Sequence, residues 1–403
     1  MRTAEGNVTR YEDSDRASGF YSFITDEAGG VSSYTRSADG MRVVKSLPCG
    51  TNLGFSFALD PLYYYKYVTL QRETTPAGLV RINEYARSYV DTNNDKIPDK
   101  ITETSKVNSR VSTLITDILA STRTSTSAAG RVVSAAYDPA TLLTASVSVP
   151  GLHPTRYAYD AQGRLTSVAQ GDASTSRAAS YAYDAKDNLA AVTDPTGKTT
   201  SFDYDAIGRR IAIHRPDGTN IAFTYDANGN MTVLTTPTAA AHAFAYTKTN
   251  LNNSYDTPLA NHYKYIYDRD KRLVRTEYPS GKSVVNTYAN GVLNSTSTPE
   301  GNILYSYLCA SKLGAISKTG ETIAYTYDAS LVMSETSAGT LNQTLSYIYD
   351  NDFRPTRFSY AGAASDYTYD DLAAKRRKPL TPHLAAVGIR CGSFAAAPRK
   401  VMS

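Results

Sequence analysis

One short motif recurs along most of the chain: an aromatic residue, any residue, tyrosine and aspartate. Intact copies run from Tyr157–Asp160 to Tyr367–Asp370, and degenerate copies such as Asn286–Ala289 keep the spacing. The aspartate position recurs twelve times between residues 138 and 370, with a mean step of about 21 residues. Such a period indicates a repeat protein, whose size is set by copy number rather than by a count of globular domains.

Each repeat is predicted to be a β-hairpin. Two aromatic residues at positions i and i+2 point to the same face of a strand. The aspartate opens a turn, where its carboxylate can accept backbone N–H groups two residues on. A glycine and then a basic or amide residue follow in the better copies, and a Pro-x-Gly turn such as Pro216–Gly218 ends the unit. The residues of this repeat signature are Tyr157, Tyr159, Asp160, Gly163, Arg164, Tyr181, Tyr183, Asp184, Tyr204, Asp205, Gly208, Arg209, Tyr225, Asp226, Gly229, Tyr265, Tyr267, Asp268, Tyr325, Tyr327, Asp328, Tyr347, Tyr349 and Asp350.

The number of hairpins constrains the architecture. Twelve hairpins make about two dozen strands, whereas twisted open sheets rarely exceed about ten strands without curling or splitting. A propeller with two repeats per blade fits the residue count, but neighbouring repeats do not alternate and the Gly-His and Trp-Asp marks of such blades are missing. We therefore expect an all-β chain of repeated antiparallel hairpins in a long coiled sheet that forms an open or partial hollow shell.

The regular repeats define three regions. Residues 1–129 show no sustained helical period and carry faint versions of the second turn, so we interpret them as degenerate repeats of the same sheet. Residues 130–371 form the regular repeat region. Residues 372–403 lose the register, contain the basic run Lys375–Lys378 and become rich in alanine. This change predicts a disordered tail from a truncated or frame-shifted reading frame.

Composition excludes several classes of protein. The apolar fraction of 41% is enough for a core and excludes wholesale disorder. A net charge of +4 is too weak to indicate nucleic-acid binding. No stretch approaches the roughly 18 apolar residues of a membrane span, and Met1–Asn7 shows no signal peptide. The tyrosine content, 32 residues beside 10 phenylalanines and no tryptophan, is mostly explained by the motif.

No catalytic motif is recognisable. The five histidines form no HExxH pair, and neither a Gly-x-Ser-x-Gly elbow nor a P-loop is present. The repeated aspartates are plural and periodic, and turn capping explains them, so we predict that the chain is not an enzyme. The three cysteines, Cys49, Cys309 and Cys391, are far apart and odd in number, which fits neither a disulfide framework nor a CxxC metal site.

Two segments outside the repeat could bind a ligand. The segment 91–99 resembles the start of a calcium loop of the EF-hand or thrombospondin type 3 kind, with oxygen ligands at Asp91, Asn93, Asp95 and Asp99. Lys96 replaces the glycine of such a loop and Thr102 its bidentate glutamate, so a polar loop without metal is the alternative. The aromatic cluster Leu62–Tyr67 could be a carbohydrate platform, although a sheet strand with aromatic residues on both faces is the simpler interpretation.

The repeat as a whole resembles a known family. Aromatic-x-Tyr-Asp-x-x-Gly-Arg-Leu followed by Pro-x-Gly, at this period over residues 130–371, is similar to the YD repeat of Rhs proteins, of the C components of insecticidal Tc toxin complexes and of teneurins. The resemblance implies a spiralling β-sheet that builds a hollow shell. In bacterial members the shell encloses a C-terminal toxin, whereas teneurins use it as an extracellular adhesion scaffold. The acidic residues of the family's autoproteolytic core cannot be assigned to positions here.

The resemblance leads to two functional expectations. The first is a non-enzymatic scaffold, a fragment of a shell, secreted or at the cell surface, whose partner is an enclosed C-terminal toxin or a secretion-system component. The second is a surface or secreted module that binds glycans through exposed tyrosines. Buried tyrosine pairs would favour the scaffold and exposed rows the glycan-binding module. We expect no cofactor, calcium at the segment 91–99 excepted.

Overall fold

The computed structural model describes residues 1–172, 176–309, 311–369 and 375–377, which form 34 β-strands and one short 3-10 helix, η1 (Pro48–Gly50). The strands before the regular repeats are β1 (Arg10–Arg16), β2 (Gly19–Thr25), β3 (Val31–Ser37), β4 (Arg42–Ser46), β5 (Asn52–Leu59), β6 (Lys66–Thr74), β7 (Val80–Val90), β8 (Lys100–Val107), β9 (Arg110–Asp117) and β10 (Thr122–Thr126). Those of the first regular repeats are β11 (Val132–Tyr137), β12 (Thr144–Ser148), β13 (Thr155–Tyr159), β14 (Leu165–Gln170), β15 (Arg177–Tyr183), β16 (Leu189–Thr193), β17 (Thr199–Tyr204), β18 (Arg210–His214), β19 (Asn220–Tyr225), β20 (Met231–Thr235), β21 (Ala241–Tyr246) and β22 (Asn252–Asp256). The remaining strands are β23 (His262–Tyr267), β24 (Leu273–Glu277), β25 (Ser283–Ala289), β26 (Val292–Thr298), β27 (Gly301–Leu308), β28 (Lys312–Lys318), β29 (Glu321–Asp328), β30 (Leu331–Ala338), β31 (Gln343–Tyr349), β32 (Pro355–Tyr360), β33 (Ala363–Tyr369) and β34 (Lys375–Arg377).

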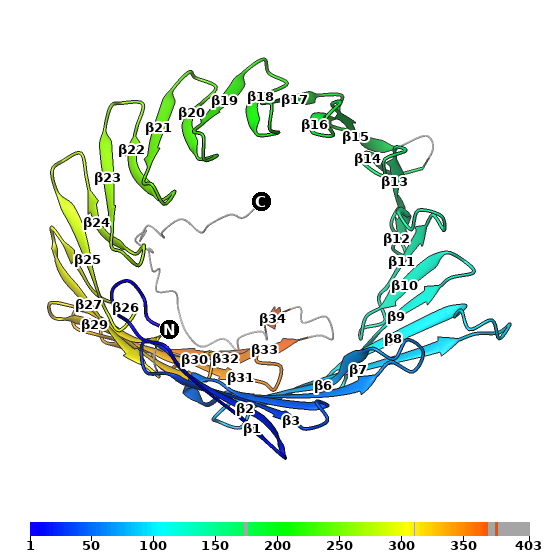
Figure 1. Ribbon diagram of the computed structural model, residues 1–403, viewed down its shortest axis with the longest axis horizontal. Coiled ribbons are helices and arrows are strands. Elements are labelled where there is room, and N and C mark those ends of the chain that lie inside the picture. The colour runs from blue at the N-terminus through cyan, green and yellow to red at the C-terminus, as the bar shows by residue number, and fades with distance from the viewer. Residues whose placement is uncertain (173–175, 310, 370–374, 378–403) are drawn as a thin grey trace.

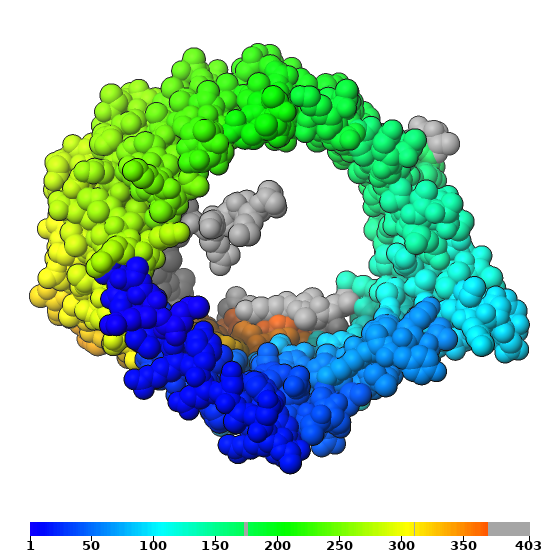
Figure 2. Space-filling view, viewed as in Figure 1, coloured from blue at the N-terminus to red at the C-terminus, as the bar shows by residue number. Residues whose placement is uncertain are grey.

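The strands form one continuous antiparallel meander. Each strand pairs with the strand before it and the strand after it, from the β1–β2 hairpin to the pairing of β33 with β34. The sheet coils into a ring around an open space, and its last strands come to lie alongside its first ones (Figure 1). The space-filling view shows the same hollow centre (Figure 2). The prediction of a coiled, open, all-β shell is therefore confirmed.

A β-bulge marks each repeat. The register of the hairpin shifts just before the second tyrosine of the motif, as between Ala158 and Tyr159 or between Thr224 and Tyr225. A bulge bends its strand and increases the local twist. Because the same bulge recurs from β11 to β31, its bends add up in one direction, which is consistent with the coiling of the sheet.

The wall has almost no fully buried apolar core. Among the described residues only Val43, Tyr137 and Ala329 are buried hydrophobic side chains. The physical reason is that the described strands form a single sheet, and no second layer of these strands packs on it. The apolar residues instead form half-buried rows of cross-strand neighbours, such as Phe202 beside Ile213, and each such pair contributes roughly 0.2–1 kcal/mol.

The first 129 residues continue the sheet. The turns predicted there are present, with Gly40, Gly78 and Gly130 at positive φ and bonded back across each turn. In the tail, Lys375–Arg377 forms β34, and the rest of the expected disordered segment, with Cys391, lies outside the described residues. The described residues include no helix long and apolar enough to cross a membrane.

Candidate functional site

The most regular site is the corner between the two strands of each repeat, which we call the YD corner. At residues 204–210 the Asp205 carboxylate accepts the backbone N–H groups of Ile207 (3.0 Å) and Arg209 (2.9 Å). Gly208, at φ 83°, closes the turn with its N–H on the Asp205 carbonyl. The Arg209 N–H lowers the pKa of Asp205 below its ordinary value, and the Arg209 guanidinium adds to this effect. The carboxylate thus organises its own turn, as the sequence predicted.

The basic or amide residue after the glycine belongs to the same corner. Arg209 Nε donates to Asp205 Oδ2 at 2.7 Å, and Arg164, Arg272 and Arg354 do the same to their own aspartates at 2.7–2.9 Å. Where the residue is asparagine, its Nδ2 donates instead, as in Asn188 and Asn230. Both residue types supply a side-chain N–H donor to a carboxylate, which explains why either arginine or asparagine serves there.

The corner also reaches into the next repeat. The Arg209 guanidinium lies over the Tyr225 ring, 4.8 Å from its centre, and Arg164, Arg272 and Arg354 lie over Tyr183, Tyr288 and Tyr369 at 4.5–4.8 Å. Cation–π contacts of this kind contribute about 0.5–1 kcal/mol at exposed sites.

The second tyrosine of the motif completes this link between repeats. Its hydroxyl donates to the carbonyl of the first or second residue of the return strand of the preceding repeat, at 2.6–3.1 Å. The donors are Tyr183, Tyr204, Tyr225, Tyr246, Tyr267, Tyr288, Tyr307, Tyr349 and Tyr369. Sequence reasoning placed these rings on one face but missed the hydroxyl, because its acceptor is a backbone atom about 15 residues away.

Asp328 departs from this pattern. Its carboxylate accepts the Thr75 hydroxyl (2.5 Å) and the Ala77 N–H (2.9 Å), which belong to the turn between β6 and β7. The side chain is buried in this contact. Turn capping therefore does not explain every repeated aspartate, and the expectation is corrected at this position. The reason is that this corner faces the first strands of the coil.

Asp328 belongs to a line of contacts that we call the seam, where corners of β23–β32 meet the segment before β1 and the turns between β1 and β9. Near one end, Asp270 accepts the Thr3 hydroxyl (2.7 Å) and the Glu5 N–H (2.9 Å). Near the other, Asp352 accepts Asn108 Nδ2 (2.5 Å) and pairs with Arg110 (2.8 Å).

The seam aspartates share a sequence signal. Asp270 and Asp352 are each only 11% exposed, and each lies two residues after the motif aspartate. The second acid of Tyr-Asp-x-Asp was therefore a signal that could have indicated the seam.

A covalent bond crosses the seam as well. Cys49 and Cys309, 260 residues apart in sequence, form a disulfide with their Cα atoms 5.2 Å apart. The inference from cysteine number and spacing was therefore wrong. Spacing along the chain is a poor guide in this fold, because the coil brings η1 back beside the corner between β27 and β28.

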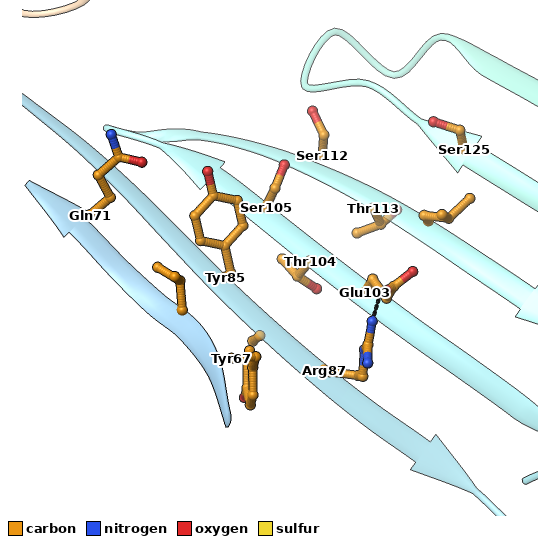
Figure 3. Close-up of a pocket in the computed structure, with 13 residues that line it drawn as sticks. Tyr67, Gln71, Tyr85, Arg87, Glu103, Thr104, Ser105, Ser112, Thr113 and Ser125 are labelled. Atoms are coloured by element: carbon orange, nitrogen blue, oxygen red, sulfur yellow. Dashed lines mark hydrogen bonds and ion pairs between the residues drawn. The ribbon is translucent and has the colours of Figure 1, made fainter. Parts of the chain in front are cut away.

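A shallow groove crosses β6–β10 on one face of the sheet (Figure 3). It has a volume of about 510 Å³, and Tyr67, Tyr85, Gln71 and several serine and threonine side chains line it. Arg87 and Glu103 form an ion pair at one end of the groove. The arrangement offers ring faces and hydroxyl, amide and charged groups together.

A fully buried carboxylate lies beside Arg87. Asp60 accepts the Tyr89 hydroxyl at 2.5 Å and the N–H groups of Leu62 and Tyr63, and lies 3.4 Å from Arg87 Nη1. Burial works to raise the pKa of Asp60, but the Tyr63 N–H and the Tyr89 hydroxyl outweigh it, and the pKa is lowered. Asp60 thus fixes the turn that carries the aromatic cluster.

The cluster itself is not a strand, and that interpretation of residues 62–65 is wrong. Tyr63, Tyr64 and Tyr65 lie in the turn between β5 and β6 and are 56%, 73% and 45% exposed. Tyr64 has φ 56°, which extended strand geometry does not allow.

The segment 91–99 forms a polar loop between β7 and β8. Asp91 accepts the Lys96 N–H, Asn93 and Asp95 hydrogen-bond each other, and Asp99 turns away to accept the N–H and hydroxyl of Thr92. Asp91 Oδ1 is buried without a hydrogen-bond partner. In the described part of the chain no three His, Cys, Asp or Glu side chains are grouped so that they could hold a metal ion. Calcium binding stays a prediction.

These features define the class of protein: a repeat scaffold whose wall is one coiled sheet, with corners that tie each hairpin to the next. A sequence model of the teneurin YD-shell matches residues 80–372. The chain therefore belongs to the teneurin YD-shell family, and the resemblance found in the sequence is confirmed. No curated protein matches the chain.

One solved structure supports the fold, and others align with it less closely. The crystal structure of TcdB2-TccC3-TEV aligns with a TM-score of 0.54 and 13% identity over 92% of this chain and 22% of that one. The crystal structure of TcdB2-TccC3 aligns with a TM-score of 0.47 and 11% identity over 94% and 29%. The structure of the Photorhabdus luminescens Tc holotoxin pore aligns with a TM-score of 0.47 and 12% identity over 90% and 27%. The chain thus spans less than a third of the length of these solved chains.

Proposed function

We propose that this chain is a non-enzymatic wall segment of a YD shell and that the space it surrounds receives a polypeptide cargo. The observation that carries the proposal is the single-layered ring around an open centre (Figure 2). A fold with three buried hydrophobic residues among those described is organised around a space rather than around a core. The resemblance to Rhs and Tc proteins supplies the class of cargo, a C-terminal toxin.

The corner geometry supports a mechanical role for the repeated aspartates. The carboxylates of Asp160, Asp184, Asp205 and Asp226 are each occupied by their own turn. A general acid or base needs a carboxylate that can reach a substrate proton. The disulfide supports a location in an oxidising compartment, as in secreted or cell-surface proteins.

Protection from protease tests the cargo proposal. An unstructured reporter polypeptide is fused after Ser403 and digested with trypsin. The control is the same polypeptide added in trans to the unfused chain. We expect the fused polypeptide to be cleaved more slowly, since the wall excludes the protease. Equal rates in the two arrangements would count against enclosure.

A second candidate function is glycan binding. The observation that favours it is the exposed turn of Tyr63, Tyr64 and Tyr65, which Asp60 holds near the groove of β6–β10. Exposed aromatic rings with a polar edge suit the faces of sugars. A glycan array tests it, with Tyr64→Ala as the variant and Tyr11→Ala, an exposed tyrosine of β1, as the control. Binding that Tyr64→Ala abolishes and Tyr11→Ala retains would support the site, whereas an array without hits argues against it.

A further inference from the structure

The seam is bonded differently from the rest of the wall. Within the wall, each strand is joined to its neighbours by a ladder of backbone hydrogen bonds. Across the seam, the described strands share no such ladder, and the contacts run between turns and side chains. The aspartates of these contacts are buried or nearly so, but the contacts are separate points of one or two hydrogen bonds or ion pairs each, rather than a continuous ladder. The seam is therefore the line along which the ring opens most easily.

The disulfide lies in the middle of that line. Going along the later strands, the contact points are Asp270, Gly291, Cys309, Asp328 and Asp352. At Gly291 the two sides approach so closely that an added Cβ would lie 2.4 Å from a Glu27 carboxylate oxygen. One covalent bond with two contact points on either side keeps the whole seam in register.

The two cysteines occupy unusual and accessible positions. Cys49 has φ 70° and Cys309 has φ 34°, a region of backbone space that favours glycine. Cys309 is exposed and Cys49 is half-buried, so a small thiol can reach the bond from solvent. An exposed disulfide is the kind that thiol–disulfide exchange attacks.

We propose that the Cys49–Cys309 disulfide is a redox-sensitive closure of the ring: it locks the seam when oxidised and lets the seam open when reduced. A thiolate of a small dithiol attacks one sulfur and forms a mixed disulfide, and the second thiol of the reagent then displaces the cysteine. The reagent becomes a cyclic disulfide and gives two electrons to the cysteine sulfurs. With two protons, Cys49 and Cys309 become two free thiols. A small-molecule disulfide such as oxidised glutathione reverses the reaction. The inference goes beyond the proposed function and does not depend on a cargo.

Hydrogen exchange of the full chain tests this closure. The chain is prepared once with oxidised glutathione and once with dithiothreitol, and peptide mapping records whether Cys49 and Cys309 are linked. On reduction we expect exchange to rise roughly tenfold or more in the seam segments, residues 3–7, 47–51 and 75–79, because the tether that keeps the two sides at high effective concentration is lost. The strands β17–β22, on the far side of the ring, should keep their rates (Figure 1).

Two variants complete the test. Cys49→Ser should show the fast seam exchange under both conditions, whereas Cys391→Ser should behave as the unaltered chain. If Cys49→Ser does not fold, the comparison of the oxidised with the reduced natural chain still tests the proposal. The proposal is overturned if the two cysteines do not link under oxidation, if reduction leaves seam exchange unchanged, or if it accelerates all strands alike.

Discussion

At the residue scale, the tyrosine hydroxyl is the group that turns a row of rings into a linked wall. The hydroxyl of Tyr225 donates to the carbonyl of Arg210 at 2.8 Å, so it joins β19 to the start of β18. Nine described tyrosines make the equivalent bond. Phenylalanine offers the same ring without this donor, which explains why the second aromatic position is tyrosine.

Tyr225→Phe isolates the hydroxyl. Removing one hydrogen bond to a backbone carbonyl costs about 1 kcal/mol, which corresponds to about fivefold faster local opening. We expect amide exchange in β18 and β19 to accelerate by that factor and exchange in β13 and β14 to stay constant. Tyr64→Phe, at a mostly exposed tyrosine, is the matched control and should change neither. Unchanged protection in Tyr225→Phe would show that the hydroxyl contributes nothing to the wall.

The calcium prediction also belongs to single residues. Asp91 Oδ1 is buried without a partner, and Lys96 occupies the place of the loop glycine at φ 68°. If the loop binds Ca²⁺, calorimetric titration gives heat that Asp91→Asn abolishes and Asp26→Asn, in a distant turn, retains. A flat titration at millimolar Ca²⁺ would show that the loop is a polar turn only.

At the element scale, the hairpin with its bulged corner is the unit that the sequence specifies. The aromatic pair, the capping aspartate and the glycine at positive φ appear where the pattern predicted them in the intact repeats such as residues 202–209, with Asp328 the exception among the aspartates. Even where glycine is absent, as at Asp187 and Lys271, the backbone keeps φ near 65–68°. The bulge was not predicted, because its extra residue lies on the return strand and leaves no mark in the aromatic spacing.

Unfolding at alkaline pH tests whether the tyrosine hydroxyls stabilise all the hairpins at once. Burial raises the pKa of several bonded tyrosines, including Tyr246, Tyr267 and Tyr349, above the ordinary value of 10.0. A raised folded-state pKa means that the folded chain holds the proton more tightly. The protonated phenols therefore stabilise the folded chain fully below pH 10, and this stabilisation is lost as the pH rises through their folded-state pKa.

We expect the thermal unfolding temperature to fall steeply above pH 10, with the phenolate absorbance of the hydrogen-bonded tyrosines appearing together with loss of the β circular-dichroism signal. Titration of all tyrosines near pH 10 with the β signal intact would contradict buried, hydrogen-bonded phenols.

At the scale of the whole molecule, the ring depends on where the coil meets itself. The seam contacts pair corners between residues 268 and 354 with turns between residues 3 and 110. Their register is set by the number of repeats in between. A whole repeat is therefore expendable for the sheet but not for the seam.

Deleting residues 205–225 separates these two requirements. The deletion joins Tyr204 to Asp226, so the motif stays intact and β17 can pair with β20. We expect the β circular-dichroism spectrum per residue to be retained, while Cys49 and Cys309 fall out of register and titrate as free thiols. The control is a deletion of half a repeat, residues 205–214. It removes β18 alone, so the two aromatic strands β17 and β19 would have to pair with each other, and it should disturb the sheet itself. A disulfide that still forms in the first deletion would show that the ring adapts to its copy number.

The sequence by itself determined the repeating unit, its antiparallel pairing and the need to coil, because these follow from contacts between residues close together in the chain. Only the tertiary structure decided that the wall has a single layer with almost no core, and that Asp328, Cys49 and Cys309 act across a seam. These contacts join residues about 250 positions apart, and they depend on the summed bends of every hairpin in between. That sum is a property of the assembled coil and is not visible in any single repeat.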